Sequence, residues 1–170
     1  MASPETKYAV ELIRSLGAVR QFTDQPLPEK AVRDIFEVVR WSGNASNRQQ
    51  FQVLWIESRD LLQQLAALDG YAKHLAGAAA GAVIITWMER DELNAFDEGR
   101  IAERIMLTAH AHGISSCIGW LRGDGEAARK LLEQPAGRTV RTAISLGFAA
   151  SGAIRGRLRK PMEEVVFRIR

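Results

Sequence analysis

The stretch from Leu75 to Met88 constrains the fold of this chain more than any other part of the sequence. Its second half contains the unbroken apolar run AVIITWM, which begins after Gly81. A run of this kind is typical of a strand that is buried on both faces, so it predicts a sheet that has cover on each side. The stretch is well short of the roughly 20 residues that a transmembrane helix needs, and no membrane partner is therefore expected.

Composition places the chain among ordinary globular proteins. It has 170 residues, of which 46% are hydrophobic and 25% charged, so residues 1–170 are expected to form a single domain. Its only cysteine, Cys117, excludes an internal disulfide and suits a reducing compartment. Charged residues such as Glu5 and Glu11 interrupt the apolar positions near the N-terminus, which argues against a signal peptide. We expect a soluble, cytoplasmic protein.

Hydrophobic spacing predicts an order in which helices alternate with buried strands. Helical spacing indicates helices over residues 4–17, 28–39, 60–68, 97–112 and 125–132. Runs rich in branched and aromatic residues indicate strands over residues 51–57, 81–88, 114–121 and 141–148, with VVFRI near the end as a candidate fifth strand. This order favours a sheet with helices on both faces.

A polar stretch, SGNASNRQQF, separates the second helix from the first strand, over residues 42–51. Its Asn and Gln amides offer both donors and acceptors, and its small residues allow backbone N–H groups to approach a ligand. A planar heterocycle is a ligand that such a loop would suit. Taken alone, however, the stretch is more typical of a turn that is rich in capping residues.

The segment GAIRGRLRKP, at residues 152–161, is basic. In extended backbone Arg155, Arg157 and Arg159 project to the same side, which is a favourable arrangement for binding an anion. A solvated tail, a phosphate site and a nucleic-acid site all remain open on these residues. The formal charge of only +3 and the lack of interleaved aromatic residues argue against nucleic acid.

Four blocks of the sequence, taken in order, resemble the FMN-dependent nitroreductase family. The blocks are AVRQFTDQPLP (18–28), VVRWSGNASNRQQFQVLWI (38–56), DEGRIAERIMLTAHAHGISSCIGWL (97–121) and ISLGFA (144–149) followed by RLRKPMEEVV (157–166). The resemblance implies an α+β nitroreductase fold, with a mixed, mainly antiparallel central sheet of four to five strands covered by helices on both faces. It also implies a homodimer with FMN at the subunit interface.

The resemblance assigns cofactor-binding positions to residues in all four blocks. Arg20 matches a basic residue that precedes a Phe, and Ile118 and Gly119 match the strand end whose backbone N–H faces the flavin near N5. Asn44, Ser46, Asn47 and Gln49 match the family's loop that lies against the isoalloxazine ring. Arg157 and Arg159 match the family's C-terminal basic pair that binds the phosphate. Lys73 is a hypothesis for the pyrimidine edge of the flavin, and Trp120 either lines the substrate side or belongs to the core.

The chain also departs from the family pattern, chiefly at its phosphate end. Leu16 and Ala18 stand where many members have Arg and Ser, so two phosphate contacts are missing and weaker retention of FMN is expected. Arg14, Arg20 or the C-terminal arginines are the candidates to replace them. Gln50 and Phe51 stand in place of a Pro-Trp pair.

The activity implied by the resemblance is ping-pong electron transfer from NAD(P)H to a small, flat acceptor such as a nitroaromatic or a quinone. The flavin carries the chemistry, so no catalytic side chain is expected. The short region between Met88 and Asp97 predicts an open cleft. The alternatives are another flavin activity on the same fold, namely flavin fragmentation or reductive dehalogenation, and a noncatalytic module that binds a nucleotide or nucleic acid through the arginine run.

Other chemistry is less well supported by the residues. His110 and His112 lie two apart in a helix and face different sides, which argues against a metal site. Cys117 is more typical of a small core residue than of a nucleophile. A solvated helix cap is the expected role of the carboxylates Asp91, Glu92, Asp97 and Glu98.

Overall fold

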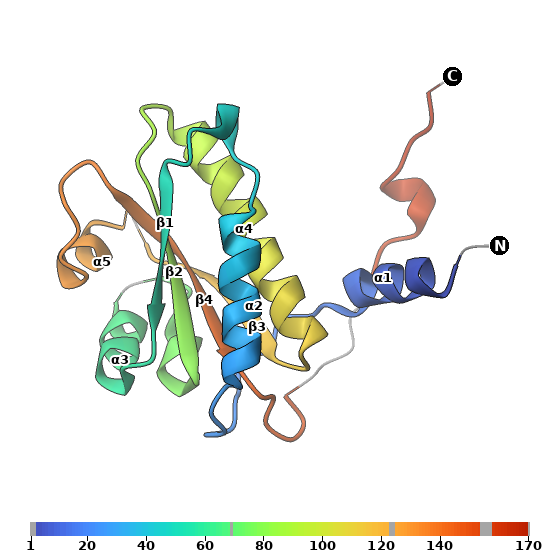
Figure 1. Ribbon diagram of the computed structural model, residues 1–170, viewed down its shortest axis with the longest axis horizontal. Helices are drawn as coiled ribbons and strands as arrows, with labels where there is room; N and C mark the ends of the chain where they lie inside the picture. Colours follow the sequence, from blue (N-terminus) through green and yellow to red (C-terminus); the bar gives the residue numbers. More distant parts are fainter. Residues whose placement is uncertain (1–2, 69, 123–124, 154–157, 170) are drawn as a thin grey trace.

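A four-stranded antiparallel sheet forms the centre of the molecule, as the computed structural model in Figure 1 shows. The structure describes residues 3–68, 70–122, 125–153 and 158–169. The strands are β1 (Phe51–Ile56), β2 (Ala80–Thr86), β3 (Ser115–Trp120) and β4 (Thr139–Gly147), and their order in the sheet is β1-β2-β4-β3. The pairings between these four strands are antiparallel, with Val83 of β2 opposite both Leu54 and Ala143. The predicted α+β class is confirmed.

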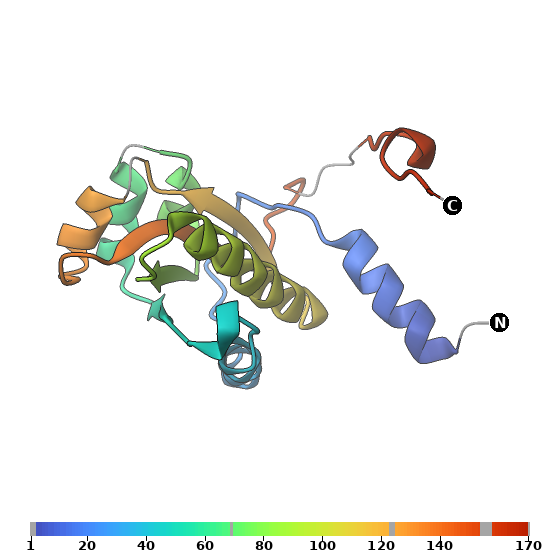
Figure 2. The same cartoon turned by 90° about the horizontal axis from the view of Figure 1, so that it is seen from above.

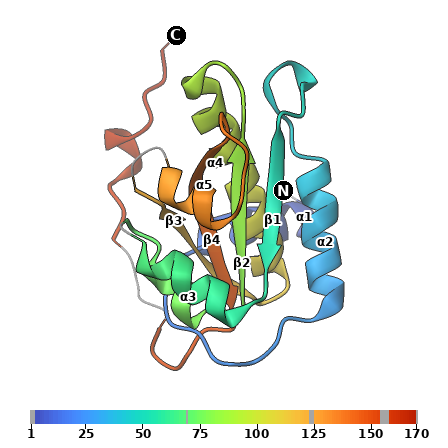
Figure 3. The ribbon, with the colours of Figure 1, turned by 90° about the vertical axis from the view of Figure 1, so that its left-hand side faces the viewer.

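Both faces of the sheet are covered, which confirms the expectation drawn from the apolar run. Val83 and Ile85 of β2 belong to a core beneath α3 (Arg59–Ala67), the 3-10 helix η2 (Lys73–Gly77) and α5 (Glu126–Leu131). The alternate residues Ala82 and Ile84 belong to a second core, beneath α2 (Glu29–Arg40) and α4 (Asp91–Ala111). Figure 3 shows α3 and α5 in front of the sheet and α4 behind it. A strand between two apolar layers needs apolar residues at every position, whichever face each one points to.

Two segments extend away from this body, as Figures 1 and 2 show. One is α1 (Pro4–Ser15). None of its residues is buried, and its apolar side chains Tyr8, Val10 and Ile13 are exposed to solvent. The other is the C-terminal segment 158–169, which contains the 3-10 helix η3 (Met162–Glu164). The candidate fifth strand at residues 165–169 is wrong for the single chain, because this segment pairs with no strand among the described residues and Phe167 is 79% exposed.

Helix α4 is longer than predicted, beginning at Asp91 instead of Asp97. Only residues 87–90 separate it from β2, so no inserted domain lies between these elements. Within the described part of the chain, no helix combines the length and apolar character needed to cross a bilayer.

Candidate functional site

Two neighbouring cavities lie along β3 and meet at Ile118. The first has a volume of about 590 Å³ and is lined by Ile13, Arg14, Leu16, Gly17, Ala18, Glu103, Met106, Ile118 and Arg159. The second has a volume of about 560 Å³ and is lined by Tyr71, Ala95, Glu98, Gly99, Ile118, Gly119, Trp120, Arg141 and Thr142. Because Ile118 and Trp120 are two residues apart in a strand, their side chains project from the same face and form a common floor.

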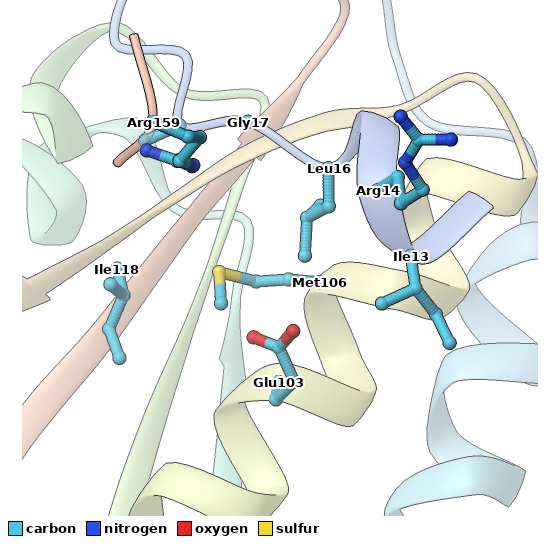
Figure 4. Close-up of a pocket in the computed structure, with 9 residues that line it drawn as sticks. Ile13, Arg14, Leu16, Gly17, Glu103, Met106, Ile118 and Arg159 are labelled. Carbon is cyan, nitrogen blue, oxygen red and sulfur yellow. The ribbon is translucent and has the colours of Figure 1, made fainter. Parts of the chain in front are cut away.

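The first cavity has a charged rim and an apolar floor (Figure 4). Arg14 comes from α1 and Arg159 from the C-terminal segment, whereas Glu103 comes from α4. Leu16, Met106 and Ile118 supply apolar surface between them. Guanidinium groups bind phosphate or carboxylate through paired N–H donors, so this cavity can hold an anionic group.

The second cavity is walled by exposed aromatic side chains. Tyr71 and Trp120 lie on either side of Gly119 and are held together by a bond from the Tyr71 N–H to the Trp120 carbonyl oxygen, at 2.8 Å. A Cβ at Gly119 would come within 2.9 Å of the Tyr71 carbonyl oxygen and the His74 ring, so only glycine allows this close packing. Aromatic walls with a narrow strand between them suit a flat ligand.

His74 lies buried behind this strand end. Its Nδ1 is 2.7 Å from the hydroxyl of Ser145 and its Nε2 is 3.1 Å from the Tyr71 carbonyl oxygen. Burial lowers the pKa of His74 below its usual 6.5, against the opposing effect of the Tyr71 carbonyl, and the nearby charge of Arg20 lowers it further. The imidazole is therefore neutral at physiological pH.

A buried carboxylate anchors the opposite wall of the second cavity. Glu98 accepts hydrogen bonds from the hydroxyls of Thr86 at 2.8 Å and Thr142 at 2.7 Å, and from Arg141 Nε at 3.1 Å. Arg141 also binds both oxygens of Asp91, at 2.8 and 2.9 Å. The predicted solvated cap is therefore wrong for Glu98 and Asp97, which are 3% and 2% exposed, because α4 starts six residues earlier, at Asp91, and both side chains lie inside the helix and face inward.

The polar loop between α2 and β1 is held by its own Asn44. The side-chain oxygen of Asn44 accepts from the Gln49 N–H at 2.8 Å, and its amide nitrogen donates to the Ser42 carbonyl oxygen at 3.2 Å. Ser46, Asn47 and Gln49 adopt φ values of 51°, 52° and 55°, in the left-handed region that nonglycine residues rarely occupy. Such strain is concentrated at ligand-binding sites, and these three side chains are exposed.

The structure brings together only part of the predicted site. Ile118, Gly119 and Arg159 line the two cavities, and Arg20 is exposed near His74. None of the described lining residues comes from the loop at residues 42–50, so Asn44, Ser46, Asn47 and Gln49 are not joined to the others within one chain. Arg157, like Arg155, lies outside the described residues.

Tyr71, Glu103 and Arg141 line the cavities although no sequence pattern predicts a role for them. Tyr71 and Arg141 lie in segments without a motif, and Glu103 lies in the block 97–121 at a position to which the resemblance assigns no role, so only the packing of η2, α4 and β4 beside β3 reveals these positions. Lys73 is exposed in η2, next to His74, and its proposed role remains a prediction. Among the described residues, no group of three His, Cys, Asp or Glu side chains has a geometry that could hold a metal ion.

A sequence model of a protein family, described as "Putative TM nitroreductase", matches residues 9–168. The chain belongs to this nitroreductase family. Solved structures with the same fold include nitroreductase A from Vibrio parahaemolyticus, which is 20% identical with a TM-score of 0.86 over 99% of this chain and 77% of that one. The FMN-dependent nitroreductase from Clostridium difficile R20291 is 18% identical with a TM-score of 0.78, over 92% and 94% of the two chains.

Other relatives of this nitroreductase-family chain have names that state a nicotinamide donor. The NADPH:FMN oxidoreductase from Vibrio harveyi, solved in complex with NAD+, has a TM-score of 0.81 at 19% identity, over 95% of this chain and 76% of that one. An NADPH-dependent oxidoreductase from Staphylococcus aureus (strain N315) is 24% identical over an alignment of 149 residues, and the match covers 75% of this chain. The chain spans 59% of the length of that curated relative.

Proposed function

We propose that this nitroreductase-family protein is an FMN-dependent oxidoreductase that takes electrons from NAD(P)H. The observation that carries the proposal is the continuous site along β3, with guanidinium groups at one end and a glycine between aromatic side chains at the other. This set of residues fits FMN, because arginine suits its phosphate and a flat, apolar surface suits its ring. FMN, when bound, accepts hydride from the nicotinamide and passes electrons to a second substrate in a ping-pong cycle.

Each part of the site has a role in this proposal. Arg14 and Arg159 bind the phosphate, with Arg14 supplying a guanidinium in place of a phosphate contact that the side chains of Leu16 and Ala18 cannot make. The Ile118–Gly119 backbone lies against the reactive edge of the ring, and the absence of a side chain at Gly119 lets Tyr71 and His74 pack closely behind this strand end. Tyr71 and Trp120 flank the position where the nicotinamide and the acceptor enter in turn.

We propose that the acceptor is a small, flat molecule such as a nitroaromatic or a quinone. The second cavity has an aromatic and apolar side, formed by Tyr71, Ile118 and Trp120, that faces the polar wall of Glu98 and Arg141, and the connection between β2 and α4 is only residues 87–90. An open, flat site makes few directional contacts with a substrate, so weak discrimination among such acceptors is expected.

We further propose a homodimer that completes the site, with FMN at the interface. Apolar side chains on α1 and on the C-terminal segment are exposed in the single chain, including Ile13, Val166 and Phe167, and they provide the surface for a second copy. The strained loop at residues 42–50 supplies no lining residue to the cavities of its own chain, which fits a role at the cavity of the partner.

The single buried Cys117 supports a cytoplasmic location.

The experiment that tests the proposed function is anaerobic spectroscopy of the purified protein after loading with FMN. We expect flavin absorbance that bleaches on addition of a nicotinamide and returns on addition of a quinone. NADH and NADPH are compared in parallel, since the faster bleaching identifies the preferred donor. A protein that takes up no FMN, or whose bound FMN neither nicotinamide reduces, would contradict the proposal.

A further inference from the structure

Glu103 places a negative charge in the cavity that holds the two guanidinium groups. It lies near the middle of α4, and Figure 4 shows its carboxylate pointing into the first cavity, on the side opposite Arg159 and Gly17. The described residues form no ion pair with Glu103, whereas many other exposed carboxylates, such as Glu37 and Glu126, are paired with a neighbouring arginine. No described residue therefore holds the Glu103 carboxylate in an ion pair, and its charge faces the cavity.

This carboxylate opposes the binding of a phosphate. A phosphate monoester carries a charge of about −1.5 to −2 at pH 7, so Glu103 repels it while Arg14 and Arg159 attract it. The remaining rim residues, Leu16 and Ala18, offer no side-chain donor that would strengthen the attraction. The phosphate end therefore binds a dianion less strongly than it would if it held the two arginines without Glu103.

We infer that Glu103 is a specificity-determining residue that reduces the preference of this site for FMN over riboflavin. The inference rests on the proposed function, and it deepens it by stating which flavins the site accepts. Both flavins have the same ring, so contacts along Ile118, Gly119 and Trp120 are the same for each and only the charged rim distinguishes them. A flavin that gains little from its phosphate exchanges readily with free flavin in solution.

The test is a binding titration, monitored by quenching of flavin fluorescence, that does not depend on turnover. FMN and riboflavin are titrated separately into the cofactor-free protein, as wild type, Glu103→Gln and Glu29→Gln. Glu29 is an exposed residue of α2 outside both cavities, so this control removes the same charge from a different place. Circular dichroism checks that the variants are folded, and Glu103→Ala provides a second removal of the charge.

We expect Glu103→Gln to lower the Kd for FMN by about three- to tenfold and to leave the Kd for riboflavin unchanged. The gain should shrink as salt is raised from about 0.05 M to about 0.5 M, because ions screen the repulsion. An unchanged ratio of the two Kd values in both Glu103 variants would overturn the inference, and so would an equal effect of Glu29→Gln. Failure of every variant, wild type included, to bind either flavin would instead overturn the proposed function.

Discussion

His74 connects the core of the sheet to the wall of the second cavity. Ser145 and the Tyr71 carbonyl oxygen flank its two ring nitrogens, and a carbonyl oxygen can only accept a hydrogen bond. The neutral ring therefore carries its proton on Nε2 and donates to Tyr71, while Nδ1 accepts from the Ser145 hydroxyl. This arrangement holds Tyr71 in place beside Trp120, so a buried polar residue positions an exposed one.

Replacing His74 should change how stability depends on pH. Because the pKa of His74 is lower in the folded protein than its usual 6.5, the unfolded chain binds the extra proton more readily, and the native protein loses stability as pH falls below about 6.5. In His74→Gln this contribution is absent. The variant should be less stable than wild type by about 1–3 kcal/mol at pH 7, from the altered buried hydrogen bonds, and the difference should narrow toward pH 5.

Urea unfolding of both proteins at several pH values measures this difference. A gap that stays constant from pH 7 to pH 5 would show that the pKa of His74 is not lowered in the folded protein. The Gln side chain has an amide N–H that can still donate to the Tyr71 carbonyl oxygen, whereas an Ala side chain has no donor. His74→Ala should therefore be less stable than His74→Gln at pH 7.

Helix α4 joins the polar loop to the cavities. On one side Asp97 accepts a hydrogen bond from the Ala45 N–H at 2.9 Å, and on another Glu98 binds the two threonines of the sheet. The second oxygen of Asp97 is buried without a hydrogen-bond partner among the described residues. One turn of this helix thus sets the position of the strained loop and of the Arg141 wall.

Substitutions at Asp97 should separate the hydrogen bond from the charge. Asp97→Ala leaves the Ala45 N–H without its acceptor and should lower the free energy of unfolding by about 1–3 kcal/mol. Asp97→Asn keeps an oxygen for Ala45 but places an amide NH2 group where the other oxygen has no partner among the described residues, so it should cost less than Asp97→Ala but should not increase stability. Chemical denaturation curves provide the comparison, and an Asn variant as unstable as the Ala variant would show that the charge itself is required.

The complete molecule is expected to be larger than one chain. Helix α1 and the C-terminal segment bury little against their own body, and together they expose Tyr8, Val10, Ile13, Val165, Val166, Phe167 and Ile169. Apolar surface of this kind on two projecting segments is costly in water and is typical of an interface. The first cavity is expected to depend on the same interface, because Arg14 and Arg159 come from the two projecting segments.

Phe167→Asp tests the assembly directly. In an isolated chain Phe167 is 79% exposed, so a carboxylate there would be nearly neutral in its effect on stability, whereas in a dimer that buries this side chain it would weaken association. We expect wild type and Phe167→Leu to sediment as dimers, and Phe167→Asp to shift toward the monomer. A wild-type protein that sediments as a monomer in the presence of FMN would contradict the assembly.

Cofactor binding should also stabilise the assembled protein. A ligand that binds only the native state adds about 2.7 kcal/mol when its free concentration is about 100 times its Kd. Removal of FMN should therefore lower Tm, and adding FMN back should restore it in proportion to the logarithm of its concentration. A Tm that does not respond to FMN would indicate that the cofactor is not linked to folding.

Much of this fold follows from local patterns. The run after Gly81 predicts a strand buried on both faces, and β2 does contribute alternate residues to two cores. Helix and strand positions can be predicted well for the same reason, since hydrophobic spacing reports which side of an element faces the core. The start of α4 cannot be predicted in this way, because Asp91 and Glu92 are exposed and Phe96, the aromatic residue that follows them, is 67% exposed and does not mark a side that faces the core. VVFRI has the composition of a strand but pairs with no strand in the part of the chain that the structure describes.

The site divides in the same way. Residue order alone is enough to relate Arg20, the loop at 42–50, Ile118 and Gly119 to a known family, because those blocks retain their order along the chain. Which residues line a cavity depends on which side chains are close in space. Tyr71, Glu103 and Arg141 come from elements that are far apart in the sequence, yet they line the two cavities that share Ile118. No periodicity records such a meeting, since it depends on how η2, α4 and β4 pack against one edge strand. Local spacing therefore specifies the layers of this protein, and long-range packing specifies which charges and rings face its ligand.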